Sequence, residues 1–217
     1  MGLVLLLLAL VTTQTSSAVL LQHNWRSPEF LWLALGSLGC SFAVLVAPAR
    51  MQFAYVFAHE LTHVCFTYLC GGKAEEAFRV SSRGGHVVTT KTNWLISLSP
   101  YFFPFYTVIG LLAFALCALL VSPGSGALLA LHAFLGFTLS LHAGFTLRVL
   151  LRNQPDLRMN GVIFSLLIIY LVNLLLVTAL LVAVSPERSF AGYLEDWSDA
   201  FDGILRFLLL VFARSVD

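Results

Sequence analysis

The chain has 217 residues, of which 59% are hydrophobic and 11% are charged, and its formal net charge is +1 at neutral pH. Soluble domains carry about 25% charged residues, so this composition indicates an integral membrane protein and excludes a separate soluble domain. The near-zero net charge, without a basic cluster, argues against a nucleic-acid partner and leaves the lipid bilayer as the expected surroundings.

Six apolar segments are long enough to cross a bilayer as helices, which takes about 20 residues. They are residues 2–21, 29–47, 51–70, 94–121, 127–150 and 161–184. The first segment lacks a basic n-region, so we interpret it as a retained span and not as a signal peptide. Pro100 and Pro104 predict a bent entry to the fourth span. The expected fold is an all-α polytopic, multi-pass membrane protein with about six transmembrane helices.

A polar stretch at residues 71–92 interrupts this pattern. Residues 78–81 and 86–90 have strand composition, and the segment 82–85 between them ends in two glycines. We expect a membrane-associated β-hairpin within residues 74–92 that dips toward the third span. Non-helical backbone at that depth is tolerated where protein or a water-filled cavity covers it.

The third span contains an H-E-x-x-H sequence formed by His59, Glu60 and His63. Residues four apart lie on one helix face, so both imidazoles can bind one Zn²⁺ per chain, with Glu60 as the catalytic general base. Ionisable residues inside a membrane are costly to bury and indicate function. The competing interpretation is a structural histidine pair, hydrogen-bonded to neighbouring helices and bridged by the glutamate.

A catalytic zinc usually has three protein ligands and one open position. Asp156 is the preferred third ligand, because it lies in a polar break at residues 151–160 whose composition suits irregular backbone. His142, in the helix leading into this break, is the alternative ligand or a supporting residue for the site. Both possibilities remain open at this point.

Charge asymmetry predicts the orientation in the membrane. With six spans, the loops at residues 22–28, 71–94 and 149–159 share one side and hold most of the lysines and arginines. The positive-inside rule places that side, and the opening of the site, in the cytoplasm. Residues 185–202 are acidic and are expected to be a soluble tail, followed by a short interfacial helix at 204–214.

These features divide the chain into two N-terminal spans, a core with the zinc motif and hairpin, and an acidic tail. The corresponding ranges are 1–50, 51–184 and 185–217.

Over residues 51–175 the chain resembles the site-2 protease family of intramembrane zinc metalloproteases. The matching features, in order, are His59-Glu60-Leu61-Thr62-His63, Gly84-Gly85-His86-Val87, Leu98-Ser99-Pro100 and Asn153-Gln154-Pro155-Asp156. The family pattern has glycine directly after the aspartate, whereas Leu157 stands there in this chain.

The resemblance implies a divergent, minimal member without a PDZ domain, which cleaves transmembrane or membrane-adjacent protein substrates. Independently of the resemblance, the hairpin offers a strand edge on which an extended substrate segment can pair, which makes Gly84, Gly85, His86, Val87 and Val88 candidate substrate-binding residues.

The alternative function is a non-catalytic membrane zinc-binding protein, either a pseudoprotease or a zinc carrier. The intact Glu60 argues against a pseudoprotease, since an inactive relative is free to lose it. A zinc protease with a downstream glutamate ligand fits poorly, because no glutamate lies between Glu76 and Glu187.

Overall fold

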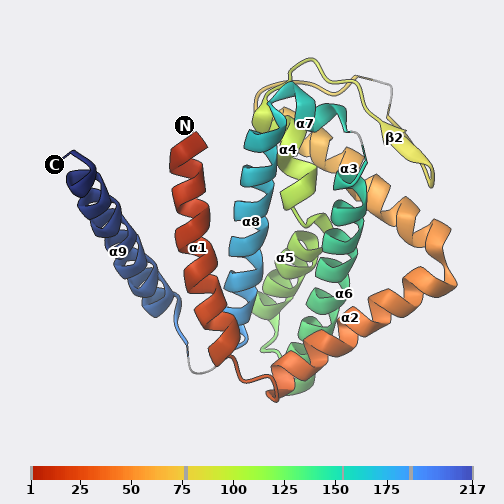
Figure 1. The fold of residues 1–217 in the computed structure, drawn as a ribbon. Coiled ribbons are helices and arrows are strands. Elements are labelled where there is room, and N and C mark those ends of the chain that lie inside the picture. The colour runs from red at the N-terminus through yellow and green to blue at the C-terminus, as the bar shows by residue number, and fades with distance from the viewer. Residues whose placement is uncertain (1, 76–77, 153, 186–187, 217) are drawn as a thin grey trace. The chain divides into compact units, whose positions relative to one another are not determined.

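The computed structural model describes residues 2–75, 78–152, 154–185 and 188–216. Within these ranges the chain forms helices and one small antiparallel sheet (Figure 1). The elements are α1 (Gly2–Gln22), α2 (Pro28–Val46), α3 (Pro48–Leu69), β1 (Arg79–Ser81), β2 (Gly84–His86), α4 (Trp94–Phe102), α5 (Phe105–Leu120), α6 (Ser125–Leu150), α7 (Pro155–Met159), α8 (Val162–Ala183) and α9 (Phe190–Val216). They form two compact units, one from residues 26–162 and one from the segments before and after it.

Four helices of the described chain are long and apolar enough to cross a membrane, namely α1, α2, α6 and α8. The bent pair of α4 and α5 makes a fifth candidate if it is counted as one span. On α2 the large side chains of Leu38, Phe42 and Leu45 are exposed, which requires a lipid or protein neighbour. The chain is therefore an integral membrane protein.

The structure does not show the six membrane-spanning helices that the sequence predicts. The third predicted span, residues 51–70, falls in α3, which is long enough at 22 residues but not apolar enough to count as a span. Arg50 and the H-E-x-x-H side chains lower its hydropathy relative to the other long helices. The same polar residues that indicate a site thus weaken the membrane-span signal.

Prolines and glycines mark the ends of α3. Pro48 occupies its first turn, where a missing N–H costs nothing. At the other end Gly71 has φ +74°, and the N–H groups of Gly71 and Gly72 donate to the carbonyls of Tyr68 and Thr67. This Schellman arrangement ends the helix and turns the chain toward the hairpin.

The largest helix–helix contact of this unit joins α2 and α6. A Cβ atom at Gly36 would lie 1.8 Å from the carbonyl oxygen of Ala133, and one at Gly136 would lie 1.9 Å from that of Leu33. The hydroxyl of Ser37 also donates to the carbonyl of Gly136 at 3.2 Å. Small residues thus bring the two backbones together, as is common between membrane helices.

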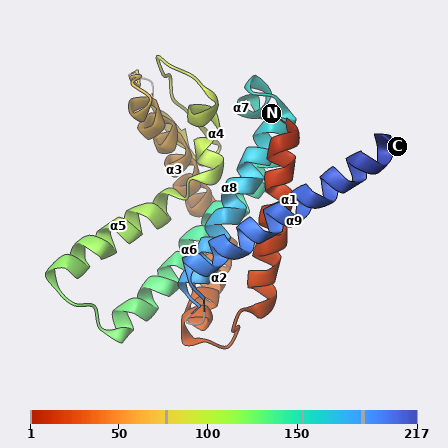
Figure 2. The same ribbon diagram turned by 90° about the vertical axis from the view of Figure 1, so that its left-hand side faces the viewer.

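The segment 94–121 is not one straight helix. Asn93 caps α4, because its side chain accepts from the N–H of Ile96 at 2.9 Å. The axis then bends by 75° between α4 and α5, next to Pro104. The predicted bent entry is confirmed, and Figure 2 shows α5 leading to a turn from which α6 returns.

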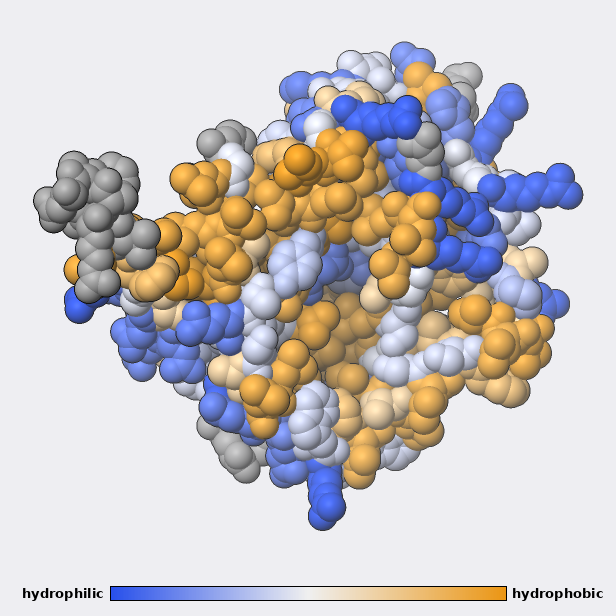
Figure 3. All heavy atoms as spheres, viewed as in Figure 1, coloured by the Kyte–Doolittle hydropathy of each residue, from blue (hydrophilic) through white to orange (hydrophobic). Residues whose placement is uncertain are grey.

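The predicted hairpin is confirmed, with a different register. Strand β1 pairs with β2 through Arg79 and His86, Val80 and Gly85, and Ser81 and Gly84. The second strand therefore begins at Gly84, two residues before the prediction, and the two glycines lie in the strand instead of the turn. Residues 76 and 77 of the predicted hairpin lie outside the described ranges. In Figure 3 hydrophilic side chains gather over this region, at the upper right.

The other unit consists of α1, α8 and α9. The hydroxyl of Thr178 donates to that of Ser16 at 2.7 Å, and the indole N–H of Trp197 donates to Thr12 at 3.1 Å. The predicted bounds of the short helix, 204–214, are wrong, since α9 is one amphipathic helix from Phe190 to Val216. Its acidic residues share one helix with the apolar ones, so the periodicity extends through both segments. Residues 186 and 187 of the tail lie outside the described ranges.

Candidate metal centre

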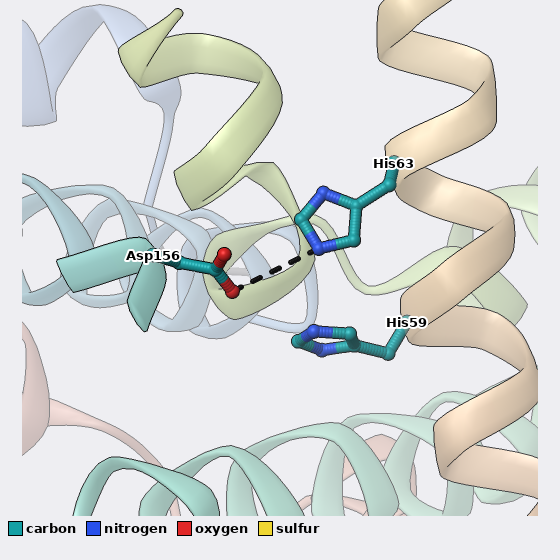
Figure 4. Close-up of side chains that lie close together, drawn as sticks. All are labelled: His59, His63 and Asp156. Carbon is teal, nitrogen blue, oxygen red and sulfur yellow. Dashed lines mark ion pairs between the residues drawn. The ribbon is translucent and has the colours of Figure 1, made fainter. Parts of the chain in front are cut away.

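His59, His63 and Asp156 converge at one point (Figure 4). The two histidines come from one face of α3, and the aspartate comes from α7, more than 90 residues later in the chain. One potential ligand atom of each residue lies within 4.8 Å of those of the others. The Nε2 atom of His63 is 3.9 Å from Oδ2 of Asp156. The structure therefore brings together the three residues predicted as metal ligands.

The ring of His63 is oriented by a backbone contact. Its Nδ1 lies 2.9 Å from the carbonyl oxygen of Ile96. A carbonyl only accepts, so Nδ1 carries the proton, and in the neutral ring Nε2 presents its lone pair to the Asp156 carboxylate. Two electron-pair donors that face each other at 3.9 Å suit a shared cation.

The short helix α7 carries Asp156 into the site. Pro155 occupies the first turn of this helix, and the side-chain amide of Asn160 donates to the carbonyl of Asp156 at 3.1 Å. Gly161, with φ +87°, then ends the turn in a conformation that favours glycine. Gly161 thus follows the end of α7, and the predicted polar break is partly helical.

Tyr101 contacts two of the three potential ligands, Asp156 and His59. Its side chain is fully buried, and its hydroxyl donates to Oδ2 of Asp156 at 2.8 Å. Its ring meets the ring of His59 edge-on, with the centroids 5.2 Å apart. Tyr101 was not predicted from the sequence. The sequence offers one signal for its role. Tyr101 directly follows Ser99 and Pro100, and a buried tyrosine hydroxyl needs a hydrogen-bond partner.

Glu60 lies beside the converging residues and is only 8% exposed. Strand β2 covers it closely. A Cβ atom at Gly85 would lie 2.4 Å from Cγ and 2.7 Å from Oε1 of Glu60. Only glycine allows this approach of the strand to the carboxylate, which explains one of the two glycines in the hairpin.

A cleft of about 400 Å³ opens in front of these residues. It is lined by His59, Glu60, His63, Gly85, His86, Val87, Thr89, Thr92, Ile96, Ser97, Gln154, Pro155, Asp156 and Met159. Three predicted substrate-binding residues line it, namely Gly85, His86 and Val87. Gly84 and Val88 are not among the lining residues, and the carbonyl of Val88 instead accepts from the N–H of Glu75 at 2.8 Å.

His142 lies on α6 and is buried. It lines a second, small cavity together with His59 and Tyr55. It does not belong to the group formed by the other two histidines and Asp156. His142 therefore lies next to His59 across this cavity and is not grouped with the three potential metal ligands.

No protein-family model, no curated protein and no solved structure matches this chain. The function is therefore argued from the geometry of the site.

Proposed function

We propose that the protein is an intramembrane zinc metalloprotease that hydrolyses peptide bonds of transmembrane or membrane-adjacent substrates. One observation carries this proposal. His59, His63 and Asp156 converge beside Glu60 at the wall of a cleft. A set of two histidines and one carboxylate that leaves a coordination position open is typical of hydrolytic zinc sites.

The three side chains fit a zinc ion in their chemistry and in their spacing. Tetrahedral ligands at about 2.0–2.1 Å from zinc lie roughly 3.3 Å from one another. The pair of His63 and Asp156 at 3.9 Å approaches this separation within a small side-chain adjustment. Zinc held there would supply Lewis-acid activation of a water molecule.

Glu60 supplies the proton transfer. It follows His59 directly on α3, so its carboxylate lies beside the ligands without being one of them. We assign to it the acceptance of the proton from the attacking water and its delivery to the leaving amine. Its near-complete burial keeps bulk water from competing for that proton.

Strand β2 offers a place for the substrate backbone. One edge of β2 pairs with β1, and its other edge pairs with no strand of the described chain. Gly85, His86 and Val87 line the cleft. An unwound substrate segment can add to this edge as a further strand, which exposes carbonyls that a helix would hide.

The basic residues around the cleft support an opening on the cytoplasmic side. Arg26, which was predicted on that same side, instead lies at the other end of this unit, because α2 runs parallel to α6. Six exposed lysines and arginines lie in the hairpin region and around α7, in the segments that also line the cleft. They are Lys73, Arg79, Arg83, Lys91, Arg152 and Arg158. The positive-inside rule then assigns the mouth of the cleft to the cytoplasm.

The test is to compare the wild type with Glu60→Gln, both purified in detergent. Fluorescently labelled casein serves as the substrate, because its extended segments need no unwinding. We expect equal zinc content in both proteins and a loss of cleavage of about 10²- to 10⁴-fold in Glu60→Gln, the usual contribution of a general base. Equal cleavage by the two proteins would refute the assignment.

A non-catalytic zinc-binding protein is the second candidate function. The contact of Gly85 with Glu60 favours it, because the hairpin leaves the carboxylate only 8% exposed. This candidate predicts zinc in both the wild type and Glu60→Gln, and no cleavage by either. The same comparison therefore distinguishes the two functions.

A further inference from the structure

We infer that Tyr101 is a positioning residue for the metal centre, which holds the Asp156 carboxylate and the His59 ring in the orientation that binds the ion. The inference rests on the proposed zinc site and names the residue that pre-organises it.

The first support is the hydrogen bond between Tyr101 and Asp156. The phenol O–H donates to Oδ2 at 2.8 Å, a normal length for such a bond to a carboxylate. Oδ2 is also the atom that lies 3.9 Å from Nε2 of His63. The tyrosine thus fixes the carboxylate oxygen that faces the histidine.

The second support is the environment of the hydroxyl. The Tyr101 side chain has no exposed surface, whereas Asp156 is half-buried and its short helix follows an irregular segment. A buried phenol keeps its place because the surrounding packing fixes it. The more rigid residue therefore anchors the more accessible one.

The third support is the contact with His59. The two rings are perpendicular, at 89°, with their centroids 5.2 Å apart. Edge-to-face packing restricts rotation of the imidazole about its χ2 angle. Tyr101 therefore contacts two of the three potential ligands, while the carbonyl of Ile96 holds the third, His63.

Loss of a group that orients a metal ligand typically weakens metal affinity by about 10- to 100-fold. Tyr101→Phe removes the O–H and keeps the ring that packs on His59. We expect its dissociation constant for zinc to rise by that factor. Tyr106→Phe is the matched control, because the Tyr106 hydroxyl donates to the backbone carbonyl of Ala54 at 2.8 Å, whereas that of Tyr101 donates to Asp156.

The measurement is a zinc titration of the purified protein in competition with a chromophoric chelator. It is done for the wild type, both tyrosine variants, Asp156→Ala, and the double variant Tyr101→Phe with Asp156→Ala. If the tyrosine acts through the aspartate, Tyr101→Phe weakens zinc binding in the wild type and adds little once Asp156 is absent. Thermal melting of the metal-free proteins reports any general loss of stability separately.

Three outcomes decide the inference. A rise of about 10- to 100-fold for Tyr101→Phe alone, absent in the Asp156→Ala background and in Tyr106→Phe, supports it. Wild-type affinity in Tyr101→Phe overturns it and leaves the zinc protease standing. An equal loss in both backgrounds also overturns it, because the effect is then structural. Absence of zinc binding by the wild type instead refutes the proposed function itself.

Discussion

The close approach of strand β2 to Glu60 makes Gly85→Ala the sharpest perturbation of the site. The added Cβ would lie 2.4 Å from Cγ and 2.8 Å from Cδ of Glu60, where ordinary contacts are 3.4–4 Å. The strand or the glutamate must therefore move by about 1 Å. A displacement of this size in a catalytic group costs roughly 10²-fold in rate, because the reacting groups leave their productive geometry.

The assay for Gly85→Ala follows casein cleavage and zinc content in the same samples. We expect cleavage to fall by about 10²-fold while zinc stays bound, since no ligand is changed. Gly124→Ala is the control, because a Cβ there meets no atom within 4 Å. Wild-type cleavage by Gly85→Ala would refute the arrangement of the hairpin over Glu60.

Two further predictions concern the helix contacts within each unit. Gly136→Ala should lower stability in detergent by about 1–3 kcal/mol, the usual cost of overpacking. Gly144→Ala, on the same helix α6, is its control, because the added Cβ meets no atom within 4 Å and should leave the denaturation midpoint unchanged. Equal midpoints for these two variants would contradict the close α2–α6 contact. Thr178→Val removes the hydroxyl that donates to Ser16 and should cost about 0.6 kcal/mol, the average for such bonds between membrane helices. A stabilised Thr178→Val protein would count against that bond.

The sequence sufficed for the parts of the fold that depend on local signals. Apolar length predicted α1, α2, α6 and α8, and the composition of residues 71–92 predicted the hairpin. The spacing of His59 and His63 placed them on one helix face. The segment 51–70 was also predicted as a helix and is found as α3, but the polar residues of the site lower its mean hydropathy below that of the candidate spans.

The remaining features depend on contacts between distant segments, which local patterns do not report. Gly84 and Gly85 resemble a turn in sequence, but both lie in β2, and Gly85 lets the strand approach Glu60 where a side chain would not fit. Tyr101 meets Asp156 only through the contact of α4 with α7. The continuous helix α9 was missed because its acidic residues suggested a soluble segment.

The zinc content of the purified protein tests the central claim most directly, measured in detergent for the wild type, Asp156→Ala and His142→Ala. The arrangement of His59, His63 and Asp156 predicts one zinc per chain in the wild type after dialysis against metal-free buffer, kept in His142→Ala and lost in Asp156→Ala, which retains only weak binding by the two histidines. A wild type without zinc, or zinc that is lost with His142→Ala and kept with Asp156→Ala, would contradict it.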